Sequence, residues 1–201
     1  MRVMLVCVRV MQAADLAAAP LTKTVSRESA VAFIDPAFMT FDLAILMKQG
    51  PTSSRIRNIR ELGAQWEIKY GVVVGGSTEV FIRVTQTGVY PRMSVTMEAE
   101  PDTSYLQSVE EGVTRVCQST DSEPFAFIGE KYMLEYQASH GPCELTVIDA
   151  DAQEYTESQR GQYNLAARKG LDASTKIRLQ EALTNLSDNG KLQELYDRWW
   201  A

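Results

Sequence analysis

The spacing of apolar residues along the chain predicts short buried strands that alternate with short helices. Continuous apolar runs, which are typical of buried strands, occupy residues 16–19, 41–47, 70–74, 125–128 and 145–148. Helical spacing of apolar residues occurs instead in segments 56–62, 80–84, 109–116, 179–186 and 192–199. This alternation predicts an α/β fold with a parallel sheet covered on both faces. A Gly-Pro-Ser-Thr cluster at 48–54 is the best candidate for a domain boundary.

The first predicted strand stops at Pro20, and a short helix is expected over 25–32 after the hydroxyls of Thr22 and Thr24. Arg27 falls in the first turn of that helix, where the helix dipole disfavours a cation. Its planar guanidinium suits a carboxylate partner that accepts two hydrogen bonds. These residues alone still favour an ordinary surface or salt-bridged arginine.

Two further positions are candidates for ligand contacts. Gly75-Gly76-Ser77-Thr78 precede a predicted helix, and backbone N–H groups at such a start can bind an anion. A capped helix with nothing bound accounts for this motif equally well. Glu130 follows the strand 125–128, and ligands of parallel sheets bind at the carboxyl ends of strands. The alternative for Glu130 is a surface carboxylate at a strand end.

Composition narrows the class of partner. The 201 residues carry a net charge of −6 and a pI near 4.9, which argues against nucleic acid or an anionic membrane. His140 is the only histidine and the three cysteines lack metal-ligand spacing, so neither a metal nor another cofactor is expected. The apolar segment 1–11 is too short to span a membrane, and Arg9 interrupts it as a signal peptide.

Six segments, taken in order, resemble the ligand-binding domain of ionotropic glutamate receptors. They are ADLAAAPLTKTVSRESAVAF (14–33), IRNIRELGAQWEIKYGVVVGGSTEVF (56–81), SVEEGVTRV (108–116), FAFIGEKYMLEY (125–136), GPCELTVI (141–148) and GKLQELYDRWW (190–200). The resemblance covers nearly the whole chain from Ala14 to Trp200.

The resemblance implies an α/β fold, a two-lobed clamshell of the periplasmic-binding-protein type (type II). Lobe 1 would comprise 1–48 plus 149–201 and lobe 2 would comprise 52–148. Because the family's opening strands are missing, lobe 1 is expected to be incomplete. The family's membrane segments are missing between Met47 and Arg55, so this chain is expected to be soluble and unable to conduct ions.

The resemblance also assigns ligand-binding roles to eight positions. They are Pro20, Thr22, Arg27, Ser77, Thr78, Glu130, Met133 and Tyr163. By this resemblance Arg27 clamps the α-carboxylate of an amino acid, helped by Thr22 and the Pro20 carbonyl. Glu130 pairs with the α-ammonium, and Ser77 and Thr78 receive the side-chain acid. Met133 lines the pocket, and Tyr163 matches the tyrosine of an altered GYGIA segment.

The implied ligand is L-glutamate or a related amino acid, because Glu130 resembles AMPA- and kainate-type receptors, whereas NMDA- and delta-type receptors carry aspartate there. Tyr132 replaces a smaller family residue, which bears on pocket volume. The chain is thus expected to be the extracellular binding module of a ligand-gated cation channel, a homo-oligomer through lobe 1 in an intact receptor. The alternatives are a soluble amino-acid-binding protein of a transport system and an enzyme such as a dehydratase, for which one histidine gives little support. Cys143 is expected to be a free thiol, because its family partner lies beyond Ala201.

Overall fold

The computed structural model describes residues 14–150 and 161–200. The apolar segment 1–11, considered above as a signal peptide, and most of the polar loop 149–161 lie outside the described residues. The chain divides into two compact units, unit 1 within 1–41 and 160–201 and unit 2 within 42–159. Within the described residues each unit has its own sheet.

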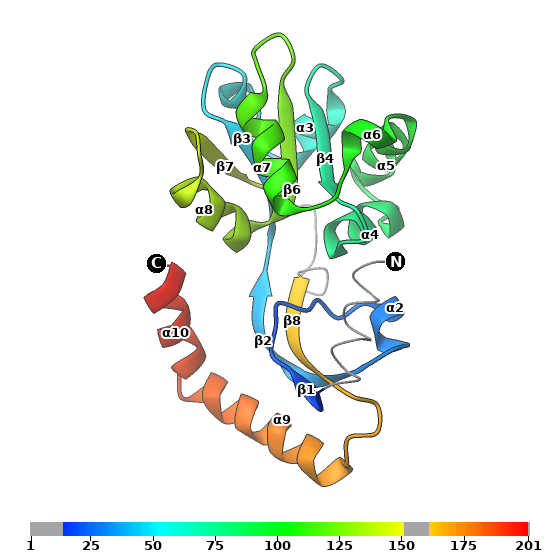
Figure 1. The fold of residues 1–201 in the computed structure, drawn as a ribbon, viewed down its shortest axis with the longest axis vertical. Coiled ribbons are helices and arrows are strands. Elements are labelled where there is room, and N and C mark those ends of the chain that lie inside the picture. Colours follow the sequence, from blue (N-terminus) through cyan, green and yellow to red (C-terminus); the bar gives the residue numbers. More distant parts are fainter. Residues whose placement is uncertain (1–13, 151–160, 201) are drawn as a thin grey trace. The chain divides into compact units, whose positions relative to one another are not determined.

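The sheet of unit 1 is antiparallel, with the strand order β1-β8-β2 (Figure 1). Its strands are β1 (Leu16–Ala17), β2 (Ala32–Phe41) and β8 (Gly161–Ala167). The helices of this unit are α2 (Val25–Glu28), α9 (Ala173–Asp188) and α10 (Lys191–Trp200). Leu183 of α9 packs against Ile34 and Ala167 in a small core, so the apolar face of α9 covers the sheet.

The helix ends of unit 1 follow from local chemistry. Thr24 is the N-cap of α2, as the sequence predicts, and its side chain accepts a hydrogen bond from the Arg27 N–H. Asp172 caps α9 by accepting from the Thr175 N–H. Gly190, with φ +73°, ends α9 because glycine adopts the left-handed conformation without strain.

Unit 2 is built on a sheet with the strand order β5-β4-β6-β3-β7. The strands are β3 (Leu43–Lys48), β4 (Lys69–Val73), β5 (Tyr105–Leu106), β6 (Phe125–Glu130) and β7 (Leu145–Asp149). β4 runs parallel to β5 and β6, whereas β3 runs antiparallel to β6 and β7. The expectation of a parallel sheet is therefore wrong for β3, which runs opposite to the other four strands, because a strand buried on both faces has the same apolar pattern in either direction.

Helices cover the sheet of unit 2. They are the 3-10 helix η1 (Ser53–Arg55), α3 (Ile59–Ala64), α4 (Ser77–Val84), α5 (Tyr90–Ala99), α6 (Pro101–Ser104), α7 (Val109–Gln118) and α8 (Lys131–His140). Val113 and Val116 of α7 and Leu134 of α8 pack on Leu46 and Phe127 of the sheet. The apolar residues of β3 from Leu43 to Met47 are all buried, so both faces of this strand are covered, as predicted.

The boundaries between the two units along the sequence differ from the predicted ones. β3 belongs to unit 2, since Leu43 pairs with Glu130 and Ala44 with Asp149. The turn at 48–54 thus lies inside unit 2 and is no boundary. The helix predicted over 25–32 ends at Glu28, and Ala32 already belongs to β2. A register shift between Ile34 and Met39, around Pro36, hides the alternating pattern of this strand.

The expectation of a free Cys143 thiol is wrong. Cys143 forms a disulfide with Cys117, and their Cα atoms lie 5.8 Å apart. The bond joins the last turn of α7 to the segment before β7. A separation of 26 residues has no local signature, so only the packing of α7 on the sheet brings the two cysteines together.

Candidate ligand-binding site

In unit 1 the segment 21–23 lies beside β8. The Asn164 N–H donates to the Leu21 carbonyl at 3.1 Å, and Thr22 forms an antiparallel bridge with Tyr163. Residues paired across antiparallel strands point to one face, so the side chains of Thr22 and Tyr163 share a face. Thr22 is only 8% exposed, and its Oγ1 has no hydrogen-bond partner among the described residues. An enclosed hydroxyl without a partner costs stability, which marks it as a group that a ligand could satisfy.

Arg27 contacts the backbone of Thr22. Its Nη1 donates to the Thr22 carbonyl at 2.9 Å, which holds the half-buried side chain against the 21–23 segment. Within residues 14–150 and 161–200, Arg27 has no carboxylate partner. A salt bridge, one of the two ordinary roles that the residues alone favour, is therefore not found there, and most of the guanidinium donors remain available to a ligand.

Tyr163 is the third candidate in this part of unit 1. We call Thr22, Arg27 and Tyr163 the unit 1 half-site. Tyr163 is buried, and its ring lies 4.5 Å from that of Phe41 and 6.3 Å from that of Phe38, measured between centroids. Phe38 and Phe41 belong to β2. The sequence predicts only the last residue of this strand, Phe41, as part of a strand. Pro20 is exposed at the end of the segment after β1, and its carbonyl accepts no hydrogen bond from the described residues.

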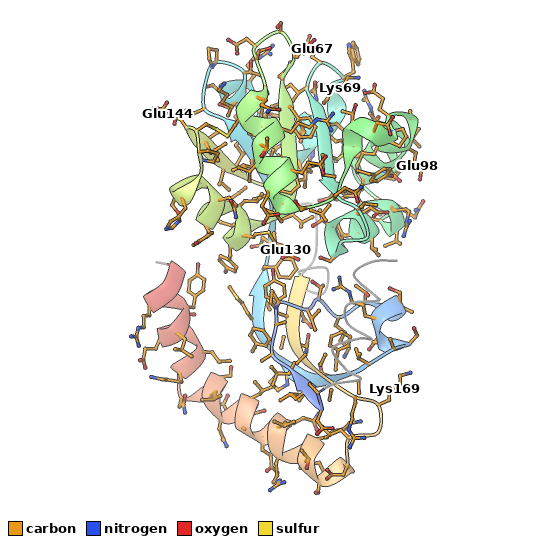
Figure 2. The ribbon with its side chains drawn as sticks, in the orientation of Figure 1. Glu67, Lys69, Glu98, Glu130, Glu144 and Lys169 are labelled. Atoms are coloured by element: carbon orange, nitrogen blue, oxygen red, sulfur yellow. A yellow bond between two sulfur atoms is a disulfide. The ribbon has the colours of Figure 1, made fainter. Side chains whose placement is uncertain are left out.

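In unit 2 the parallel strands β4 and β6 end at the same edge of the sheet. Glu130 is the last residue of β6, and α4 begins with Ser77 shortly after β4 (Figures 1 and 2). The Ser77 hydroxyl donates to Glu130 Oε1 at 2.9 Å. Two candidates separated by more than fifty positions are thereby brought into contact, at the edge where such sheets bind ligands.

The start of α4 keeps part of its predicted anion-binding capacity. The Gly75 N–H donates to the Glu79 carboxylate and the Gly76 N–H donates to the Val73 carbonyl. The backbone N–H groups of Ser77 and Thr78 donate to no acceptor in the described part of the chain, since α4 lacks a side-chain cap. Thr78 is buried. These two N–H groups and the Thr78 hydroxyl are the donors left for a ligand.

Met133 and Lys131 follow Glu130 on α8. Met133 is half-buried, and no contact with another candidate residue was found in the described part. The Lys131 ammonium lies 2.8 Å from Asp149 Oδ1, and its hydrogen bond to that carboxylate raises the pKa of Lys131. The Lys131 N–H donates to the Asp42 carbonyl, so the start of α8 is tied to the segments that enter and leave unit 2.

Sequence reasoning missed Glu79 and the two phenylalanines. Glu79 is the third residue of α4 and bonds back to a preceding N–H, a capping signature that a glutamate at this place could have indicated. Arg83, one turn later, lies 3.3 Å from the same carboxylate. The contact of Phe38 and Phe41 with Tyr163 has no signal in the sequence, because it depends on the register of β2.

Other features of the described residues do not alter this picture. A hollow of about 310 Å³ in unit 2 is lined by the 48–52 turn and by Ser119 to Asp121, at the opposite edge of the sheet from Glu130. The described residues contain no group of side chains that could hold a metal ion. Among the helices in 14–150 and 161–200, none is long and apolar enough to cross a membrane.

A family model for bacterial extracellular solute-binding proteins, family 3, matches residues 10–201. The chain belongs to this family. The family 3 solute-binding proteins and the relatives named below are binding proteins and receptors, not enzymes. The match confirms the predicted periplasmic-binding-protein-like α/β fold, with a separate sheet in each of two units.

Glutamate receptors are among the relatives of this family 3 chain. It is 30% identical to glutamate receptor 3 of Mus musculus and 29% identical to that of Rattus norvegicus, over 161 residues in both cases. Those residues are 80% of this chain and 17% of either receptor, so the chain spans only a small part of the curated relatives. The structure of a Drosophila muscle GluRIIB complex with glutamate superposes with a TM-score of 0.80 at 25% identity, covering 96% of this chain and 72% of that one. The resemblance to the ligand-binding domain of glutamate receptors is thereby confirmed.

Proposed function

We propose that this chain binds an α-amino acid, with L-glutamate as the first candidate. The observation that carries the proposal is the opposite charge of two candidate residues, Arg27 in unit 1 and Glu130 in unit 2. Unit 1 offers a guanidinium with no carboxylate partner in the described residues, and unit 2 offers a buried carboxylate at a strand end. A zwitterion carries the two opposite charges, and charge-assisted hydrogen bonds contribute about 1.5–3 kcal/mol each.

The residue roles in this proposal are those that the resemblance implies. Arg27 holds the α-carboxylate, and the Thr22 hydroxyl and Pro20 carbonyl complete that end of the ligand. Glu130 receives the α-ammonium. Thr78 and the N–H groups at the start of α4 receive a side-chain acid, with the Ser77 hydroxyl beside them.

Each unit also offers an apolar side chain that we assign to the ligand. In unit 1 this is Tyr163, held by Phe41, and in unit 2 it is Met133 in the first turn of α8. Tyr132 precedes Met133 and stands where the family has a smaller residue, so we expect it to restrict the size of the ligand.

In a longer protein we infer that the chain serves as the extracellular ligand-binding module of a ligand-gated cation channel, which pairs with a second copy through unit 1. The curated glutamate receptors support this role. Binding would bias the channel only if one conformation of the module binds the amino acid more tightly than the other. The second candidate is an amino-acid-binding protein of a transport system, which the family model favours.

The test is a thermal-shift and calorimetric screen of the purified chain with L-glutamate, glycine, D-serine and kainate. L-glutamate at 100 times its Kd is expected to stabilise the protein by about 2.7 kcal/mol. Arg27→Lys is expected to abolish most of that shift, because lysine keeps the charge but lacks the planar fork.

Arg178→Lys is the matched control, since Arg178 is exposed on α9 of the same unit. Kainate binding would support the receptor role over the transport role. Absence of a shift and of binding heat with every amino acid would overturn the proposal.

A further inference from the structure

The hydroxyl of Ser77 is already used within unit 2. It donates to Glu130 Oε1 at 2.9 Å, which joins the first residue of α4 to the last residue of β6. Glu130 is also the N-cap residue of α8, yet its carboxylate makes no capping hydrogen bond there. Glu130 is buried, and its Oε1 accepts a hydrogen bond from the first residue of α4. The Ser77 hydroxyl therefore helps to set the direction of this carboxylate.

A serine hydroxyl has a single proton to donate. While that proton is directed to Glu130, Ser77 cannot donate to a carboxylate on a ligand. The donors at the start of α4 that remain are the N–H groups of Ser77 and Thr78 and the Thr78 hydroxyl, none of which donates to an acceptor in the described residues. The two adjacent side chains, Ser77 and Thr78, thus have different tasks.

We propose that Ser77 is a positioning residue that holds Glu130 in place for the α-ammonium of the ligand. This inference rests on the proposed binding of an α-amino acid. Since every α-amino acid has that ammonium, the Ser77 hydroxyl contributes equally to the binding of all of them. Selection of a ligand with a side-chain acid falls to Thr78 and to the N–H groups of α4.

The experiment compares two ligands that differ in the side-chain acid, L-glutamate and L-alanine, by calorimetry on Ser77→Ala and Thr78→Val. Ser77→Ala is expected to weaken both ligands by the same factor, about 10-fold, because the same charge-assisted bond is lost. Thr78→Val is expected to weaken L-glutamate about 10-fold and to leave L-alanine unchanged. Ser77→Thr retains a hydroxyl and is expected to restore both affinities, which a loss of packing would not explain.

The outcomes separate this inference from the function on which it rests. If Ser77→Ala weakens L-glutamate and spares L-alanine, Ser77 contacts the side-chain acid and the inference is overturned while the function stands. If neither affinity changes, the hydroxyl does not position Glu130, and the inference is again overturned while the function stands. If the parent protein binds neither amino acid, both proposals fail. Melting curves verify that each variant folds, and Ser77→Cys, with a weak donor, replaces Ser77→Ala if that variant does not.

Discussion

In unit 1 the Thr22 hydroxyl is enclosed without a partner in the described residues and Arg27 donates to a single carbonyl, whereas in unit 2 Ser77 and Glu130 are bonded to each other. A ligand that reaches the unit 1 residues adds bonds to groups that lack them. A ligand that reaches Ser77 Oγ or the Glu130 carboxylate must share or exchange the bond that already joins them. We therefore expect unit 1 to contribute more to affinity and unit 2 more to the choice of ligand.

The largest expected effect tests whether both half-sites serve one ligand. Glu130→Gln keeps an acceptor for the Ser77 hydroxyl but removes the charge that would pair with an ammonium. We expect L-glutamate to bind about 10- to 100-fold more weakly, as one charge-assisted bond is lost. Isothermal calorimetry on this variant and on Arg27→Lys measures the two halves with the same ligand.

The control is Glu98→Gln on α5, an exposed carboxylate of the same unit that is labelled in Figure 2. Unchanged affinity in Glu130→Gln, together with a loss in Arg27→Lys, would mean that unit 2 does not contact the amino acid through this residue.

The next effect concerns stability and separates the two units. Only unit 2 has a disulfide among the described residues, and it closes a loop of 26 residues. Chain-entropy arguments give such a bond a contribution of about 3.5 kcal/mol to the free energy of unfolding. The double substitution Cys117→Ser and Cys143→Ser is expected to lower the stability of unit 2 by about that amount, measured by urea unfolding and by amide exchange.

Thiol labelling of the unreduced protein provides the independent check. Cys117 and Cys143 are expected to resist labelling until a reductant is added. Labelling of Cys143 without reduction would contradict the disulfide and would restore the expectation that the sequence alone supports.

A smaller effect is expected for Thr22→Val, which should raise the stability of the ligand-free protein but lower its affinity for the ligand. Thr22→Val replaces an enclosed hydroxyl without a partner by an apolar group of similar shape, so the ligand-free protein should gain about 1 kcal/mol. The same substitution should weaken L-glutamate about 10-fold, because the ligand loses that hydroxyl. Thermal melts and calorimetry on one preparation measure both quantities.

Thr85→Val in unit 2 is the matched control. Its buried hydroxyl donates to the Phe81 carbonyl at 2.7 Å, so its loss should not stabilise the protein. If Thr22→Val destabilised the ligand-free protein as well, the Thr22 hydroxyl would have to be satisfied within the chain.

The parts of the fold with strong local signals could be predicted from the sequence. β3, β4 and β6 contain continuous apolar runs. The cap of α2 is the side chain of Thr24, which directly precedes the helix. β2 could not be predicted in the same way, because its register shift interrupts the alternation on which such predictions depend.

The candidate site likewise contains residues with a local signal in the sequence and residues without one. The sequence predicts Ser77 from the start of a helix and Glu130 from the end of a strand, and parallel pairing of β4 with β6 then brings them together. The orphan hydroxyl of Thr22 has no local signal, since it depends on an isolated bridge to Tyr163, far away in sequence. The disulfide is of the same kind, because tertiary packing alone selects Cys117 as the partner of Cys143.

The smallest effect contrasts a charged helix cap in unit 1 with a neutral cap in unit 2. Hydrogen bonds from Ser174 and Thr175 lower the pKa of Asp172, the cap of α9, far below its usual value. A carboxyl with a lowered pKa stabilises the fold above its unfolded pKa of about 3.9, and this contribution is lost as pH falls through the folded value. The Tm gap between the parent and Asp172→Asn should therefore be largest near neutral pH and shrink in acid. The gap for Asn58→Ala, which removes the neutral cap of α3, should stay constant, and equal behaviour of both gaps would show that Asp172 does not stabilise α9 through its charge.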